Sequence, residues 1–243
     1  MNQSIQVIIN KFEKLFTILI NPFLIFPLFK GVAAGTEHIA QLRNLKVSFF
    51  VDIGANRGQF ALVARKCFPN AKIFSFEPLP GPAGIFRKVF KDDRLTHLEQ
   101  VAIGPVEDKM ILHETMNDDS SSLLKGHLQN QIFPGTQEVG AFSVSVKPLS
   151  ALLTEADIVS PALLKIDVQG YELEVLKGCG SLLKTFEYIF VECSFLELYQ
   201  KQALAHEVIT FLAKQGFNLK GIYNMSYDKF GVAVQGDFLF EAQ

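Results

Sequence analysis

Short apolar segments alternate with amphipathic segments along most of the chain. Val47 to Ile53 is a short apolar run that predicts a buried strand, and Gly58 to Cys67 predicts the helix that follows it. Repeated strand–helix units of this kind predict a parallel sheet covered by helices on both faces. The other strands predicted in this way are Ala71–Phe76, one within Leu95–Ile103, Ala162–Ile166 and Phe186–Val191, and the other helices are Pro82–Phe90, Tyr171–Lys177 and one containing Leu204 to Leu212 that ends near Gly216.

The end of the chain departs from this alternation. Phe217 to Tyr223 and Val232 to Phe240 are consecutive predicted strands with no helix between them, so we expect an antiparallel pair at one edge. The region between Met110 and Leu149 is less regular, with β-like segments at Met110–Thr115 and Phe142–Val146 around a polar loop. The predicted fold is therefore a doubly wound, Rossmann-like α/β fold with a mostly parallel sheet and an antiparallel edge at the C-terminus.

A helical period marks the N-terminal part. The uncharged run from Leu15 to Phe29 is too short to cross a bilayer and contains Pro22 and Pro27. A more regular feature is a set of apolar residues that recur at three- and four-residue steps and would form one face of an amphipathic helix. They are Ile5, Ile8, Ile9, Phe12, Leu15, Phe16 and Leu19.

Two surroundings fit this helix, and both stay open at this point. It could dock on its own domain, or it could lie on a membrane surface through residues 5–29. Its polar face carries only two lysines and one glutamate, so electrostatic attraction to lipid would be weak. We expect an N-terminal amphipathic extension over residues 1–30, followed by an α/β domain over residues 31–243.

Composition narrows the class of protein. With 49% hydrophobic and 20% charged residues, the chain has the balance of a folded globular protein. The net charge of −2 leaves no broad basic field, which argues against nucleic acid as a partner. Cys67, Cys179 and Cys193 have neither zinc-site spacing nor the pairing of a disulfide framework, so a cytoplasmic location is expected. Nothing here fixes the oligomeric state.

A glycine-containing turn joins the first predicted strand to its helix. The segment Val51-Asp52-Ile53-Gly54-Ala55-Asn56-Arg57-Gly58 runs from a buried strand into the start of a helix. Gly54 permits a sharp bend and leaves room for a ligand beside the backbone, and a helix N-terminus favours polar or anionic groups. Such a turn is also common for packing reasons, so it is a weak signal without other elements.

Two acids strengthen the signal. Glu77 ends the next strand, about 20 residues after the turn, where a carboxylate can accept both ribose hydroxyls of an adenosine. Asp167 ends the strand Ala162–Ile166, across the switch point from Gly54, although it could equally cap the following helix. The turn and Glu77 together favour a nucleoside cofactor. The turn lacks the three glycines of G-x-G-x-x-G, which weakens a dinucleotide interpretation.

Four segments carry a resemblance to a known family. VDIGANRGQF, FSFEP, LLKIDVQGYELEVLKG and FVEC, in this order and spacing, resemble the FkbM family of methyltransferases over roughly Phe49 to Cys193. The resemblance implies a methyltransferase fold that uses S-adenosylmethionine, usually to methylate a hydroxyl oxygen, here on a sugar, glycan or other small molecule. Ser120 to Leu123 matches a serine-rich segment of the family. Leu149-Ser150 departs from its usual Leu-Asp, so we assign Ser150 no catalytic role.

The same resemblance implies the binding residues. Glu77 would bind ribose, Val101 and Ala102 would flank adenine, and Asp167 would lie near the methionine end and the acceptor. The full cofactor set is Asp52, Gly54, Ala55, Asn56, Gly58, Glu77, Pro78, Val101, Ala102 and Asp167.

A hydroxyl acceptor must also lose its proton. The groups considered as the base are Asp167, Glu172, Glu192, His113 and His127. The three acids are the predicted catalytic residues, with Asp167 the best placed, whereas the histidines read more simply as solvated loop residues. No dense carboxylate cluster demands a metal, so none is predicted.

Two other functions share part of this pattern. A Rossmann-type NAD(P)-dependent oxidoreductase would share the turn and Glu77, but it should show the denser glycine motif. A non-catalytic, membrane-associated binding module would use the N-terminal helix and leave the pocket empty. The combination of Gly54, Glu77 and Asp167 argues against that module.

Overall fold

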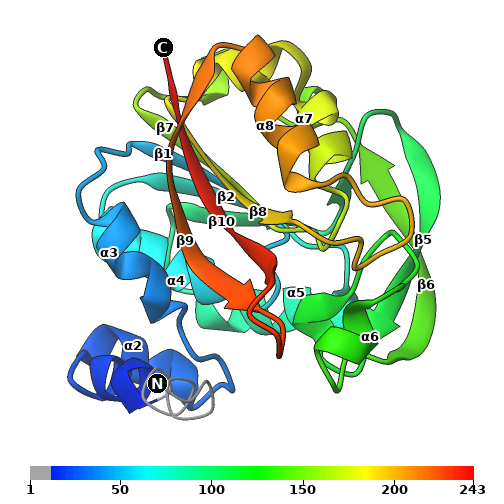
Figure 1. Cartoon of the computed structure of the whole chain (residues 1–243). Helices are drawn as coiled ribbons and strands as arrows, with labels where there is room; N and C mark the ends of the chain where they lie inside the picture. The colour runs from blue at the N-terminus through cyan, green and yellow to red at the C-terminus, as the bar shows by residue number, and fades with distance from the viewer. Residues whose placement is uncertain (1–11) are drawn as a thin grey trace.

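The computed structural model describes residues 12–243, in which a seven-stranded sheet carries helices on both faces beside a small second sheet (Figure 1). The large sheet has the order β3-β2-β1-β7-β8-β10-β9. Its first five strands are parallel, and β10 runs antiparallel to both β8 and β9. The predicted mostly parallel sheet with an antiparallel C-terminal edge is therefore confirmed.

The strand bounds agree with the predicted ones to within a few residues in most of the large sheet. The strands are β1 (Phe49–Ile53), β2 (Lys72–Phe76), β3 (Thr96–Glu99), β4 (Ala102–Ile103), β5 (Asp108–Thr115), β6 (Glu138–Lys147), β7 (Ala162–Ile166), β8 (Tyr188–Ser194), β9 (Phe217–Tyr227) and β10 (Ala233–Ala242). After a helix over residues 12–19, the α-helices are α2 (Pro22–Leu28), α3 (Ile39–Leu42), α4 (Gln59–Cys67), α5 (Pro80–Val89), α6 (Gln129–Ile132), α7 (Glu172–Cys179) and α8 (Ala205–Lys214).

The two faces of the sheet pack against different helices. Phe49, Val51 and Ile53 of β1 belong to the apolar cluster that includes the inner faces of α7 and α8. Phe50 belongs to the opposite cluster, with α4 and α5, and Asp52 follows it at the period of two that a strand imposes. All five residues of β1 are buried, which explains why the strand reads as a nearly continuous apolar run.

The region after β3 differs from the prediction of one strand within Leu95–Ile103. The chain leaves the large sheet after Glu99, and Ala102–Ile103 forms β4 in a separate sheet of order β4-β6-β5. The β-like segments predicted around 110 and 142 form β5 and β6, which pair antiparallel in this sheet. It lies beside the helical layers (Figure 1).

The N-terminal segment is attached to the domain through a few buried side chains. Ile18 and Leu24 belong to the same apolar cluster as Val63 of α4 and Phe86 of α5. The first part of the predicted amphipathic helix, with Ile5, Ile8 and Ile9, lies outside the described residues. No helix within residues 12–243 is long and apolar enough to cross a membrane.

Candidate active site

A cavity of about 550 Å³ lies where β1, β2 and β7 end. Its wall combines the turn after β1, the acid after β2 and the loop after β7, the crevice in which doubly wound folds bind ligands. A volume of this size suits a cofactor or substrate. Of the residues predicted to surround a cofactor, those that line the cavity are Gly54, Ala55, Asn56, Glu77, Pro78, Val101, Ala102 and Asp167.

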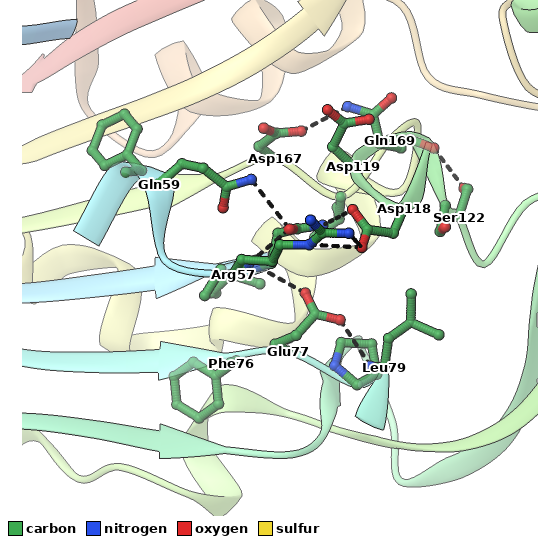
Figure 2. Close-up of a pocket in the computed structure, with 18 of the residues that line it drawn as sticks. Arg57, Gln59, Phe76, Glu77, Leu79, Asp118, Asp119, Ser122, Asp167 and Gln169 are labelled. Atoms are coloured by element: carbon green, nitrogen blue, oxygen red, sulfur yellow. Dashed lines mark hydrogen bonds and ion pairs between the residues drawn. The ribbon is translucent and has the colours of Figure 1, made fainter. Parts of the chain in front are cut away.

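Glu77 is fixed in the wall by two backbone donors (Figure 2). The N–H of Asn56 donates to Oε2 at 2.9 Å and the N–H of Leu79 donates to Oε1 at 2.8 Å. Burial raises the pKa of Glu77 to about 7, and these two hydrogen bonds act in the opposite direction. The carboxyl group is therefore held rigidly at the end of β2, with unused lone pairs for a ligand hydroxyl.

Both glycines of the turn have a positive φ and lie in close contact with neighbouring residues. Gly54 has a φ of +77°, and a Cβ built on it would lie 1.8 Å from the carbonyl oxygen of Asp167. The side of Gly54 on which a Cβ would stand is thus taken by the β7 loop, while the residue itself lines the cavity. At Gly58, with a φ of +95°, a Cβ would lie 2.6 Å from the Phe90 ring. Gly58 therefore serves the packing of α4 and does not line the cavity.

A buried ion pair lies behind the wall of the cavity. The parallel register places Asp52 of β1 directly beside Lys165 of β7, and Lys165 Nζ lies 3.1 Å from Asp52 Oδ1. Lys165 Nζ also donates to the carbonyl of Gly54 at 2.8 Å. Burial by itself lowers the pKa of Lys165, but the carboxylates of Asp52 and Asp167 outweigh burial and the pKa is raised. Asp52, predicted among the cofactor residues, is fully buried behind the wall and connects to the cavity through Lys165.

Asp167 is the predicted catalytic acid that faces the cavity. Its side chain is 38% exposed, and Oδ2 lies 3.9 Å from Lys165 Nζ. Gln169 Nε2 donates to Asp167 Oδ1 at 2.8 Å and to Glu192 Oε2 at 2.9 Å, so one amide holds both carboxylates (Figure 2 shows the first contact). Asp167 therefore has a fixed orientation and an oxygen open to the cavity.

The other two predicted catalytic acids lie outside the cavity lining. Glu172 accepts hydrogen bonds from the backbone N–H groups of Val168 and Gly170, and burial raises its pKa to about 7. Glu192 accepts from Gln169 and from Gln235. These contacts shape the β7 loop, and a direct catalytic role for either acid stays a prediction.

The histidines singled out from the sequence lie elsewhere. His113 on β5 faces Glu138, with Nδ1 3.1 Å from Oε1, and His127 is exposed in a loop. His38, which the sequence did not single out, lines the cavity between the rings of Phe60 and Phe190. Burial lowers its pKa to about 4, so it is neutral at pH 7.

A polar loop closes the cavity over the turn. Arg57 donates to Asp118 through Nε and Nη2, and Asn56 Nδ2 donates to the same carboxylate (Figure 2). The serine-rich segment follows this loop, and Ser122 Oγ donates to the carbonyl of Gln169 at 2.6 Å. The segment noted in the family resemblance therefore lies at the cavity and ties its loop to the β7 loop.

Three further residues of the site are not predicted by the sequence analysis, and they differ in whether a local sequence pattern indicates them. They are Lys165, Arg57 and Asp118. Lys165 stands as a charged residue inside the apolar strand Ala162–Ile166, which is a readable sign of a buried partner. Arg57 and Asp118 are 61 residues apart and meet only through the fold, so no local pattern indicates their contact. Within residues 12–243, no group of three or more His, Cys, Asp or Glu side chains is arranged to hold a metal ion.

The similarity to known proteins covers the part of the chain that contains most of these site residues. The profile of the methyltransferase FkbM domain matches residues 52–219. The 2-O-methyltransferase NoeI of Sinorhizobium fredii is 29% identical over 171 residues, which cover 67% of this chain and 70% of NoeI. The hexuronic acid methyltransferase AglP of Haloferax volcanii is 31% identical over 144 residues, which cover 58% of this chain and 54% of AglP. Two of the curated relatives are matched over only 58% and 54% of their own length.

A solved structure gives the same fold. A candidate O-methyltransferase from Klebsiella pneumoniae aligns with a TM-score of 0.51 at 14% identity, covering 92% of this chain and 90% of that chain. At this level of identity the likeness shows the fold and no more.

Proposed function

The chain belongs to the FkbM family of methyltransferases, and on this premise we propose that it transfers a methyl group from S-adenosylmethionine to a hydroxyl oxygen of a sugar-like acceptor. The observation that carries the proposal is that one cavity holds Glu77 and Asp167 on opposite sides of the turn after β1. The family resemblance assigns Glu77 to the ribose and Asp167 to the methionine end and the acceptor. It places the residues of the turn around the cofactor.

The cavity has the chemistry that this cofactor requires. Val101, Ala102 and Leu79 supply an apolar wall next to Glu77, where an adenine ring and its ribose would fit together. When bound, the cofactor supplies a methyl group already activated by the sulfonium. At the other end Asp167 would favour the positive charge of the sulfonium or the ammonium.

Asp167 is proposed as the base that takes the acceptor proton. It is the one of the three predicted catalytic acids that lines the cavity, and Gln169 fixes its orientation. A carboxylate within hydrogen-bond reach of a hydroxyl can accept its proton as the oxygen attacks the methyl carbon. The remaining task of the protein is to align the two reactants, which is where most of the rate gain of such a displacement arises.

The acceptor class rests on two arguments. The relatives include a protein named as a 2-O-methyltransferase and another named as a hexuronic acid methyltransferase. The acceptor side of the cavity is polar, with amide, hydroxyl and carboxyl groups that suit several sugar hydroxyls. The residues that supply these groups include Asn117, Asp119, Ser121 and Gln169.

The three cysteines of the chain are unpaired, so we propose that the protein acts in a reducing compartment, the cytoplasm.

A transfer assay tests the reaction itself. The chain is incubated with S-adenosylmethionine labelled in the methyl group and with pools of sugars, glycans and natural products. We expect label in a hydroxyl-bearing acceptor. Label only in protein, nucleic acid or carbon and nitrogen positions would contradict O-methylation.

Calorimetry tests the cofactor separately from the acceptor. S-adenosylhomocysteine should bind in the micromolar range, about −8 kcal/mol, and NAD or NADP should show nothing comparable. Glu77→Ala should weaken this binding by about 1.5–3 kcal/mol, as expected for a lost hydrogen bond to a charged group. Tight NAD binding without a response to S-adenosylhomocysteine would overturn the proposal.

The raised pKa of Glu77 predicts a pH dependence of the same binding. Ribose hydroxyls donate to the ionised carboxylate, so the ligand favours the form that predominates above a pKa of about 7. S-adenosylhomocysteine should therefore bind about tenfold more tightly at pH 8 than at pH 6. Glu77→Gln cannot titrate and should lose this dependence. An unchanged pH profile in Glu77→Gln would show that another group is responsible.

A further inference from the structure

The helix over residues 12–19 is docked with its apolar side outward. Phe12, Leu15, Phe16 and Leu19 recur at the three- and four-residue steps of one helix face, and their exposed fractions are 44–68%. The side that meets the domain contains the buried Ile18 and the half-buried Lys14 and Thr17, so it is more polar than the outer side. An amphipathic helix that only covers its own core would be turned the other way.

The exposed apolar side continues into the next helix. In α2, Leu24 and Pro27 are buried, whereas Phe23 and Phe26 point outward with exposed fractions of 46% and 58%. Phe29, just after α2, is 84% exposed. We refer to the four residues of the first helix and these three phenylalanines as the N-terminal apolar face. Both helices lie on one side of the molecule, apart from the small sheet (Figure 1).

We propose that the N-terminal apolar face docks on an anionic lipid surface. Apolar side chains clustered in this way, five of them phenylalanines, exceed the scattered exposure that is normal for a protein surface. The first 30 residues carry three lysines and one glutamate, whereas the whole chain has a net charge of −2. The segment is thus locally basic on an acidic protein, which complements the charge of anionic lipid. Apolar burial provides the main attraction, and the small excess of lysines contributes less, because Lys14 is paired with Glu37.

Part of the N-terminal apolar face belongs to the same helix that contributes Lys14 to the cavity rim. Lys14 donates to Glu37 at 3.0 Å, and both side chains line the cavity together with Gly31 and Ala33. Docking through the outer side of the same helix would place the cavity rim beside the lipid surface. The docking itself goes beyond the proposed function and does not depend on it.

Vesicle flotation with the full chain tests the docking. The chain is mixed with vesicles of phosphatidylcholine and phosphatidylglycerol, and a double variant, Phe16→Gln with Phe26→Gln, is compared with it. We expect the full chain to float with the vesicles and the double variant to lose at least about tenfold in partitioning. The control is Phe142→Gln on β6, a phenylalanine that is 41% exposed and lies away from the N-terminal helices, and this variant should float like the unchanged chain.

Two further measurements separate the alternatives. Thermal unfolding followed by circular dichroism should give the same cooperative transition for all variants, which shows that loss of flotation is not loss of fold. Vesicles of phosphatidylcholine without the anionic lipid should bind less of the unchanged chain. The proposal fails if the unchanged chain stays at the bottom of the gradient without the vesicles, or if the double variant floats equally well. It also fails if sedimentation shows that the two substitutions convert a dimer to a monomer without affecting flotation.

Discussion

Asp167→Asn is expected to lower the turnover number by about 10²–10⁴-fold, the range that a positioned general base contributes. The substitution keeps an oxygen that can accept the hydrogen bond from Gln169 Nε2, so the loop geometry should persist. It removes the group that accepts the acceptor proton. The affinity for S-adenosylhomocysteine, measured by calorimetry, should change much less than turnover. Steady-state methyl transfer to the acceptor found in the screen gives the rate.

Asp119→Asn is the matched comparison for this variant. Asp119 also lines the cavity, and its substitution removes the same charge without touching the contact between Gln169 and Asp167. We expect it to lower turnover less than Asp167→Asn does. If Asp119→Asn proves the more damaging change, or if folded Asp167→Asn transfers methyl groups at the original rate, Asp167 is not the base. It would then be a structural residue at the start of the β7 loop.

The sequence predicts the central parallel strands β1 and β7 well because each of them carries two signals. Burial on both faces makes β1 and β7 apolar runs, and a turn or an acid marks the point where the strand ends. The small sheet lacks both signals. β5 and β6 have exposed residues at many positions, and β4 is a two-residue strand whose partner β6 lies more than 30 residues away. Its separation from the large sheet is therefore a tertiary outcome.

The residues of the site divide in the same way. Glu77 and Asp167 could be found because position at a strand end implies position at the cavity. The close contact of Gly54 with the β7 loop could not be predicted from the sequence. The atom that excludes a side chain there is a backbone oxygen of that loop, over 100 residues away along the chain. The orientation of the helix over residues 12–19 was equally out of reach. Its periodicity identifies an apolar face but not what that face meets.

Lys165→Met is expected to lower the free energy of unfolding by about 3–5 kcal/mol, because it leaves the carboxyl group of Asp52 buried without its cation. Asp52 has no exposed surface, and Lys165 Nζ, 3.1 Å from its Oδ1, is also the donor to the carbonyl of Gly54. Methionine has a similar length and fills the space beneath α4, so the loss would reflect charge and hydrogen bonding more than a cavity. Urea denaturation followed by circular dichroism measures it.

The double variant Lys165→Met with Asp52→Asn distinguishes an unpaired charge from a loss of packing. With no charge left to bury, it should be more stable than Lys165→Met, because removal of both partners of a buried pair costs far less than removal of one. The pH dependence gives a second test. Burial raises the pKa of Asp52, so in Lys165→Met the folded state favours the protonated carboxyl. Stability should then be regained as the pH falls below this raised pKa and lost as the pH rises through it. If the double variant is the less stable of the two, and the single variant shows no such recovery in acid, Lys165 stabilises the fold through its packing and its bond to Gly54.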